Sequence, residues 1–528
     1  MSDTKKNKYI SPPVREFVPC SRIIAQDHAS GTETIPGNRI LRTFLGNNYP
    51  ICSIEKGGFL LLDFGTEVSG GVRIVSSGEM KHCRIRLRFG ESVSEAMNTP
   101  DPDHAIHDIE LPISSFSSTD FGNTGFRFIR IDALDSSLAL HNVIAICEHQ
   151  ACEQTGIFHS SDPLLNRIFD TSIHTVRLNM QDYLLDGVKR DRLIWGGDMH
   201  PETMVILRAF GAVSVVEDTL ELLRTHTKDR NFINGFSSYS LWYFLTLHDF
   251  WIHSGNDSLL NANRVLLESE AVRLASLVDS EGRERLPPVR FLDWPSSQSP
   301  EIIHAGLQPL LLMALRAINV MLAYLKSPVT IPETILKKLK NHVPDPRGNK
   351  PAAALQTLSG MVDRSDVLEH NPYSGVSTQF GYYLLLAKQN QKALELVRKY
   401  WGAMLDLGAT TFWEDFNLEW VPGATGIDEL PVPGRPDIHK DFGAFCYKGL
   451  RHSLCHGWAA GPAAWCSRKI LGVDPLMPGF REIRFQPDLC DLEFAEGTVP
   501  TPYGLINISL KKGRKPEIQF PGEILLRK

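Results

Sequence analysis

The chain has 528 residues, more than one ordinary hydrophobic core can organise, so we expect two to four domains. Its apolar fraction of 42% and charged fraction of 22% are typical of a soluble globular protein, and a net charge of −6 without a basic run argues against nucleic acid as a partner. No apolar run reaches the roughly 18 residues that a membrane span needs, and the polar start of the chain does not resemble a secretion signal. Nine dispersed cysteines without a CxxC pair are expected as reduced, buried thiols in a cytoplasm.

Residues 1–155 are predicted to form β structure. In the run "HCRIRLRFGES", Cys83, Ile85, Leu87 and Phe89 alternate with arginines, which is typical of a half-buried strand. The run "GFRFIRIDAL" repeats this pattern, and turn residues separate several such runs. The spacing therefore predicts an N-terminal β-sandwich.

Helical spacing takes over in residues 156–471. Ser161 or Asp162 can cap the first helix, and Pro163 suits its first position. Between short connections rich in Gly, Pro and Asp, further helices are predicted at roughly 200–224, 238–254, 258–279, 302–326, 331–343, 375–387, 390–405 and 456–471. We expect the run "HVPDPRGNKPAAA" to be a loop. From residue 472 to residue 528, short alternating runs predict a second, small β module.

The run "DGVKRDRLIWGGDMHPE" concentrates acid, base and aromatic groups in a connection between two predicted helices. Asp186 and Asp191 can serve as acid or base, Arg190 can hold one of them ionised, and Trp195 offers a flat apolar face. Carbohydrate sites need this mixture, with carboxylates for the chemistry and aromatic faces for the sugar ring. The alternative is a structural Asp–Arg network that fixes the loop.

Three more connections combine similar groups. They are "TTFWEDFNLEW" with Trp413 and Glu414, "RFLDWPSS" with Asp293 and Trp294, and "RHSLCHGWAAGP" with His456 and Trp458. An acid beside a tryptophan occurs in three connections of one helical region, which favours a shared pocket. Trp242 falls on a helical stripe typical of a core, although near a helix start it could face that pocket.

These clusters, in this order, resemble the catalytic domain of α-L-rhamnosidases, the family 78 glycoside hydrolases. The family motif D-x-x-x-R-D-E-R-x-G-W-x-G-D resembles "DGVKRDRLIWGGD", which supplies Asp186, Arg190, Asp191, Trp195 and Asp198. The D-W motif matches Asp293-Trp294, T-T-x-W-E matches the segment from Thr410 to Glu414, and a Ser-x-x-His run matches Ser453 and His456. The resemblance covers about 450 residues and implies a multidomain protein in which an (α/α)6 six-hairpin barrel is flanked by an N-terminal β-sandwich and a small C-terminal β-sandwich module.

One departure concerns the acid. The sequence has "RDR" where the motif has "RDER", so the family's general-acid Glu is missing and Asp191 is the carboxylate left at that position. The resemblance implies an inverting hydrolase in which Asp191 protonates the leaving oxygen and Glu414 activates water. The two carboxyls of such enzymes stand roughly 6.5–9.5 Å apart. A general acid has to be protonated before the reaction begins. The apolar face of Trp195 would favour the protonated form of the Asp191 carboxyl group.

The expected substrates are small rhamnose-containing glycosides or oligosaccharides, with no nucleic acid or membrane partner and with a homodimer left open. Asp186, Arg190, Trp195, Asp198 and the residues of the other clusters (Trp242, Asp293, Trp294, Trp413, His456 and Trp458) are the expected sugar-binding groups. No metal or cofactor is predicted. Two other functions fit the same residues, namely a rhamnose–glucuronate lyase, with His456, Lys189 or Arg192 recruited to it, and a rhamnoside-binding protein without activity.

Overall fold

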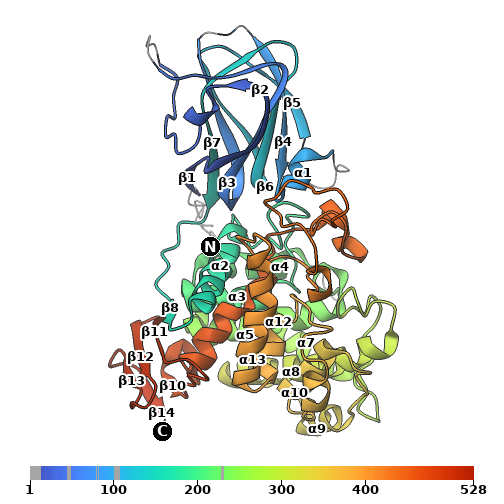
Figure 1. The fold of residues 1–528 in the computed structure, drawn as a ribbon. Helices are drawn as coiled ribbons and strands as arrows, with labels where there is room; N and C mark the ends of the chain where they lie inside the picture. The colour runs from blue at the N-terminus through green and yellow to red at the C-terminus, as the bar shows by residue number, and fades with distance from the viewer. Residues whose placement is uncertain are drawn as a thin grey trace, which may run out of the picture.

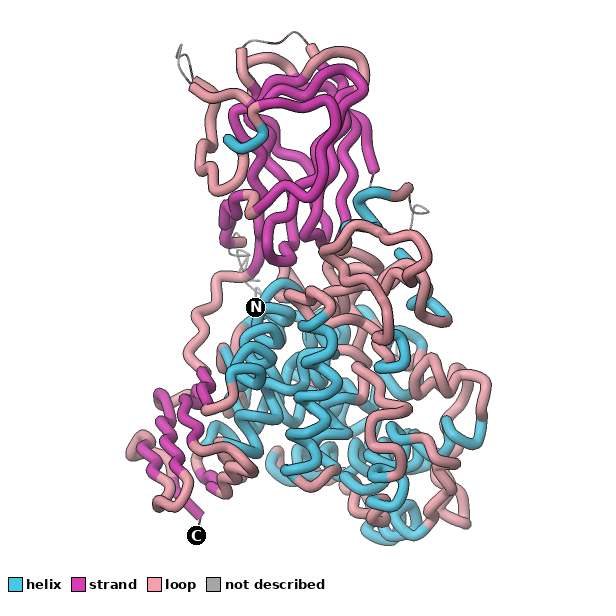
Figure 2. The backbone as a smooth tube through the Cα atoms, viewed as in Figure 1, coloured by secondary structure: helices cyan, strands magenta, loops and turns pink. Residues whose placement is uncertain are grey.

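The computed structural model describes residues 13–44, 49–78, 80, 82–99, 108–227 and 231–527. A β sheet forms one end of the molecule, a body of helices forms the middle, and a small β module lies beside the C-terminus (Figures 1 and 2). The predicted combination of β sheets with a central helical region is confirmed.

The N-terminal sheet has seven strands in the order β1-β7-β3-β6-β4-β5, with β2 paired to β3. The strand bounds are β1 (Val14–Pro19), β2 (Arg22–Ser30), β3 (Cys52–Ser76), β4 (Cys83–Gly90), β5 (Asp108–Ile113), β6 (Ser118–Ala133) and β7 (Leu138–His149). The alternation predicted for β4 is confirmed, because all four apolar side chains are buried. Arg88 is the exception on the polar face, since it is buried and pairs with Asp132 at 2.8 Å. The short helix α1 (Val93–Met97) follows β4.

The helical body runs from α2 to α15. Its helices are α2 (Pro163–Asn179), α3 (Met199–Ala209), α4 (Ser214–His226), α5 (Ser237–Ser254), α6 (Asp257–Ala262), α7 (Arg264–Ser276), α8 (Pro300–Tyr324), α9 (Glu333–Asn341), α10 (Lys350–Leu358), α11 (Ser365–Glu369), α12 (Gly381–Ala387), α13 (Asn390–Leu396), α14 (Gly402–Asp406) and α15 (Gly461–Trp465). Short 3-10 or π turns include η3 (Val397–Trp401), η7 (Gly457–Ala460) and η8 (Cys466–Ile470).

The first of these helices begins as its sequence predicts. The Asp162 carboxylate accepts hydrogen bonds from the N–H groups of Leu164 and Leu165, at 2.9 and 3.2 Å, and Pro163 occupies the first turn. A cap of this kind satisfies amide groups that have no partner within the helix.

Several predicted helix bounds were wrong. The stretch 200–224 is two helices, because the chain turns at Gly211 with φ 76°. The stretch 258–279 is also divided, at Asn263, and the helix predicted from 375 begins only at Gly381. The expected loop "HVPDPRGNKPAAA" contains the start of α10, where the Asn349 side chain accepts a hydrogen bond from the N–H of Ala352 at 2.9 Å.

Helix α8 corrects the expectation that no apolar run is long enough to span a membrane. It is long and apolar enough to cross a membrane by length and composition, with a hydropathy of 1.5 over its most apolar window. However, 78% of that window is buried inside the protein, as expected for the core helix of a helical domain.

The C-terminal module takes one strand from the predicted helical region. Strand β8 (Ile157–Ser160) pairs with β11 (Phe494–Thr501), and β12 (Gly504–Lys511) and β13 (Glu517–Gln519) complete this four-stranded sheet. A second sheet contains β9 (Val473–Pro475), β10 (Glu482–Phe485) and β14 (Leu525–Arg527). The domain boundaries expected from the sequence, 1–155, 156–471 and 472–528, stay predictions.

The N-terminal sheet shares its core with the helical body. Leu178, Val188 and Cys455 belong to the same buried cluster as the inward-facing side chains of β3, β4, β6 and β7. All nine cysteines are free, as predicted, although Cys152, Cys446 and Cys490 are only partly buried.

Candidate active site

The connection between α2 and α3 is closed by Asp186. Its carboxylate accepts hydrogen bonds from the N–H groups of Gly187 and Leu193, at 2.8 and 3.0 Å. Burial raises the pKa of Asp186 well above its ordinary value. Asp186 therefore fixes the loop through backbone N–H groups rather than through the Asp–Arg network of the structural alternative. It also brings a buried carboxyl group with a raised pKa to the site.

Asp191 and Arg192 both adopt left-handed backbone conformations, with φ 57° and 52°. Such conformations cost a non-glycine residue of the order of 1–3 kcal/mol, although Asp tolerates them better than most residues. The side chain of Arg192 donates two hydrogen bonds to Asn123 in β6 of the N-terminal sheet, one to the carbonyl and one to the side-chain oxygen. The shortened motif thus turns sharply at the position where the family's acid is missing.

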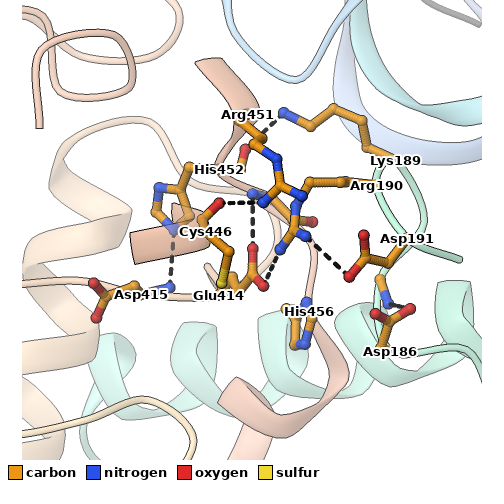
Figure 3. A network of polar contacts seen from close by, with 12 residues as sticks. Asp186, Lys189, Arg190, Asp191, Glu414, Asp415, Cys446, Arg451, His452 and His456 are labelled. Atoms are coloured by element: carbon orange, nitrogen blue, oxygen red, sulfur yellow. Dashed lines mark hydrogen bonds and ion pairs between the residues drawn. The ribbon is translucent and has the colours of Figure 1, made fainter. Parts of the chain in front are cut away.

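Arg190 joins the two carboxylates expected to carry the chemistry. One guanidinium nitrogen lies 3.0 Å from the Asp191 carboxylate, and the other donates a short hydrogen bond to Glu414 (Figure 3). Arg190 and Glu414 are both 3% exposed, whereas the Asp191 side chain is 23% exposed. The structure therefore brings the first and third motifs together around one buried cation.

Glu414 is held by the backbone of the segment around Ser453. The N–H of Ser453 donates to its carboxylate at 3.2 Å, and the N–H of Glu414 donates to the Ser453 carbonyl at 2.9 Å. The indole N–H of Trp458 donates to the Glu414 carbonyl at 3.0 Å. The fourth predicted motif thus supports the third.

His456 and Asp198 form a second polar pair in the candidate site. His456 Nε2 is 3.2 Å from the Asp198 carboxylate, and the His456 ring lies against Trp458 with centroids 4.1 Å apart. Burial lowers the pKa of His456 and raises the pKa of Asp198 well away from their ordinary values. Both effects favour the neutral forms, so this pair adds polar groups to the site without adding charge.

Aromatic rings extend from the site to the surface. Trp195 packs against Tyr239 at 5.9 Å, Tyr239 against Phe291 at 6.2 Å, and Phe291 against Trp294 at 5.3 Å. Trp294 ends this row and is 41% exposed. Within this row Tyr239 and Phe291 are buried, whereas Trp195 is partly exposed.

Three other predicted sugar-binding residues are packed in the interior. Trp242 is 2% exposed, between His200 and Tyr383, and Trp413 is 1% exposed, against Phe416. Asp293 accepts a hydrogen bond from the N–H of Ser296 at 2.9 Å, and burial raises its pKa. Their packing gives these side chains supporting contacts within the protein, and their expected contacts with a sugar stay predictions.

The sequence did not identify the groups that surround Lys189. Its ammonium lies 3.1 and 3.2 Å from the carboxylates of Glu91 and Glu95, which come from the N-terminal β region. Glu91 stands in the quoted run "RFGES", but local spacing cannot reveal partners that lie far along the chain. Its other partner, Leu454, is 363 residues away in the sequence. Asp415, noted only as a neighbour of Glu414, is half-buried, and desolvation raises its pKa to about 6.

Comparisons with known proteins agree with these motifs. The model of the bacterial α-L-rhamnosidase six-hairpin glycosidase domain matches residues 153–238, and that of the bacterial α-L-rhamnosidase C-terminal domain matches residues 472–519. An α-L-rhamnosidase of Alteromonas sp. (strain LOR) is 25% identical over 85% of this chain and 53% of its own length. The chain thus spans about half of that relative.

Solved structures show a similar fold. The Streptomyces avermitilis α-L-rhamnosidase complexed with L-rhamnose has a TM-score of 0.72 and 15% identity, over 98% of this chain and 50% of that one. A Klebsiella oxytoca rhamnosidase with rhamnose bound has a TM-score of 0.68 and 18% identity, over 87% of this chain and 96% of that one.

Fold and motifs together define a chain built like the six-hairpin glycosidases. Within that class, the resemblance to the family 78 α-L-rhamnosidases is confirmed.

Proposed function

We propose that this chain hydrolyses the terminal non-reducing α-L-rhamnose of small rhamnosides with inversion of configuration. The observation that carries the proposal is the Arg190 guanidinium, which binds Glu414 on one side and Asp191 on the other. The proposal includes an (α/α)6 closure of the helical body between two β-sandwich modules, which would place all four motifs at one end of a barrel.

Glu414 is the proposed general base. Its contact with Arg190 and the hydrogen bond from Ser453 fix its orientation. In the proposed reaction Glu414 removes a proton from water, the resulting hydroxide attacks the anomeric carbon, and the bond to the leaving oxygen breaks on the opposite face.

Asp191 is the proposed general acid, and it delivers its proton to the leaving oxygen. For this role Asp191 has to leave Arg190 when substrate binds, because its carboxyl group has to face the leaving oxygen rather than the guanidinium. Its partial exposure and position in a sharp turn suit such a movement. Asp186 and Asp198 are the alternatives, because burial raises the pKa of both carboxyls well above the ordinary value.

The sugar would be held between polar and aromatic groups. Asp198 and His456 offer hydrogen bonds to hydroxyls, and the row from Trp195 to Trp294 offers apolar surface for the ring and the 6-methyl group. Trp242, Trp413, Trp458 and Asp293 would support these groups from behind.

A rhamnose–glucuronate lyase is the second candidate. The missing Glu and the ion pair of Asp191 favour it, because β-elimination needs no such acid beside Arg190. The neutral His456 would then be the base at the uronate C5. A rhamnoside-binding protein without turnover is the remaining alternative.

We further propose a cytoplasmic location and small imported glycosides as substrates, which the nine free thiols support. A homodimer is left open.

A panel of aryl glycosides tests the proposed activity. Release of phenol from the α-L-rhamnoside, and not from other sugars, supports the hydrolase. A product with near-ultraviolet absorbance from a rhamnosyl-glucuronate would indicate the lyase. Rhamnose binding without turnover of either substrate would indicate the binding protein.

A further inference from the structure

A buried cluster of charged groups lies where the N-terminal sheet meets the loops of the candidate site. Glu91 and Glu95, at the end of β4 and in α1, are 0% and 1% exposed, and Lys189, beside Arg190, is 1% exposed. The Lys189 ammonium lies 3.1 Å from Glu91 and 3.2 Å from Glu95. Glu91, Glu95 and His439 could together hold a metal ion, but the ammonium already supplies a positive charge to both carboxylates.

The cluster binds the backbone of both loops that form the site. Lys189 belongs to the first loop and donates to the carbonyls of Leu450 and His452 in the second, at 3.0 and 2.6 Å (Figure 3 shows Lys189 beside this segment). Glu91 accepts a hydrogen bond from the N–H of Leu454 at 2.6 Å. The residue between His452 and Leu454 is Ser453, whose N–H holds the Glu414 carboxylate.

Other contacts of the sheet reach the same loops. The N–H of Glu67 in β3 donates to Thr410, the first residue of the motif that contains Glu414, at 2.9 Å. Gly125 in β6 lies so close to the first loop that a Cβ atom there would approach Val188 to 2.4 Å. The sheet therefore contacts three of the four motif segments.

We propose that Glu91 and Lys189 are positioning residues through which the N-terminal sheet sets the place of Glu414 and Arg190. The sheet is then a part of the catalytic machinery rather than a separate binding module. This inference rests on the proposed hydrolase for its kinetic consequence, although the contacts that carry it do not depend on the substrate.

Glu91→Ala tests the inference because it removes the acceptor for Leu454 and one partner of Lys189. We expect kcat for an aryl rhamnoside to fall by about 10–100-fold with KM changed less than about threefold, since small misplacements of catalytic groups cost rates of this order. Glu91→Gln keeps an acceptor oxygen for the Leu454 N–H and should recover most of the loss. The matched control is Asp474→Ala, which breaks partly buried ion pairs with Arg208, Arg468 and Arg484 and should leave kcat within about twofold of wild type.

Hydrogen exchange measured by mass spectrometry separates failure of this inference from failure of the proposed function. In Glu91→Ala, peptides covering 186–193 and 450–456 should both exchange faster than in wild type, whatever reaction the protein catalyses. If Glu91→Ala does not fold, Glu91→Asp replaces it, because its shorter side chain cannot reach both the Leu454 N–H and the Lys189 ammonium. Unchanged kcat in folded Glu91→Ala or Glu91→Asp, or unchanged exchange in both peptides, would overturn the inference.

Discussion

Arg190 and Glu414, which are 224 residues apart in the sequence, form a buried ion pair in the candidate site. The pair keeps the Glu414 carboxylate beside the loop that carries Asp191. A carboxylate so placed is suited to act as a base. The stability of the folded protein also depends on the pair, because removal of one partner leaves the other buried without compensation.

Glu414→Gln should abolish most of the activity. The amide keeps the shape of the side chain but accepts no proton from water, and loss of a general base typically costs about 10²–10⁴ in rate. The measurement is kcat for an aryl rhamnoside. Glu419→Gln, an exposed carboxylate five residues further on, is the control and should stay near wild type. Near-wild-type turnover by Glu414→Gln would move the base to another residue, with Asp415 the nearest.

Asp191→Asn should discriminate between leaving groups. An alkyl or sugar leaving group has to be protonated, whereas an acidic phenol departs as its anion, so the variant should lose far more activity on the former. Glu414→Gln should impair both substrates alike. Exposed Asp182→Asn is the control for the same loop region. Equal losses on both substrates would show that Asp191 is a structural or sugar-holding residue, and the acid would be sought at Asp186 or Asp198.

Arg190→Met should destabilise the protein as well as inactivate it. Removal of one partner from a buried ion pair typically costs about 3–5 kcal/mol, because the other charge stays buried without compensation. The free energy of unfolding in urea measures this loss. In the double variant with Glu414→Gln, much of the stability should return, and no recovery would argue against the ion pair as the cause.

The position of these residues could be predicted only in part. The order of the motifs, the capped start of α2 and the strand pattern of β4 follow from local spacing, and the structure agrees with each. The Glu91–Lys189 contact could not be predicted, since it joins the residue after β4 to a connection between helices far along the chain. The burial of Trp413 was also beyond the sequence, because a tryptophan beside an acid looks the same in a core as at a surface, whereas Trp242 is buried as its helical stripe indicated.

Trp294→Ala should weaken substrate binding without slowing the chemistry. This ring is 41% exposed at the end of the aromatic row, so its removal takes contact area from the bound glycoside. We expect KM to rise about tenfold, which corresponds to roughly 1.4 kcal/mol, with kcat little changed. Trp294→Phe keeps an aromatic face and serves as the control. An unchanged KM for Trp294→Ala would place the substrate elsewhere.

His253 should make the protein less stable in acid. Burial lowers its pKa from 6.5 to about 3, so the unfolded chain binds a proton below pH 6.5 that the folded chain does not. The stabilising contribution is complete above pH 6.5 and is lost progressively as the pH falls from 6.5 toward 3. Between about pH 7 and pH 5, wild type should lose about 2 kcal/mol more unfolding free energy than His253→Phe. Exposed His226→Gln should behave like wild type, and identical pH dependence in all three proteins would contradict the assignment.

The configuration of the first sugar released tests the central claim most directly. Proton NMR of an aryl α-L-rhamnoside during hydrolysis distinguishes the anomers before they interconvert. The proposed mechanism predicts that β-L-rhamnose appears first, because water attacks the face opposite the leaving group. Initial release of α-L-rhamnose would contradict inversion.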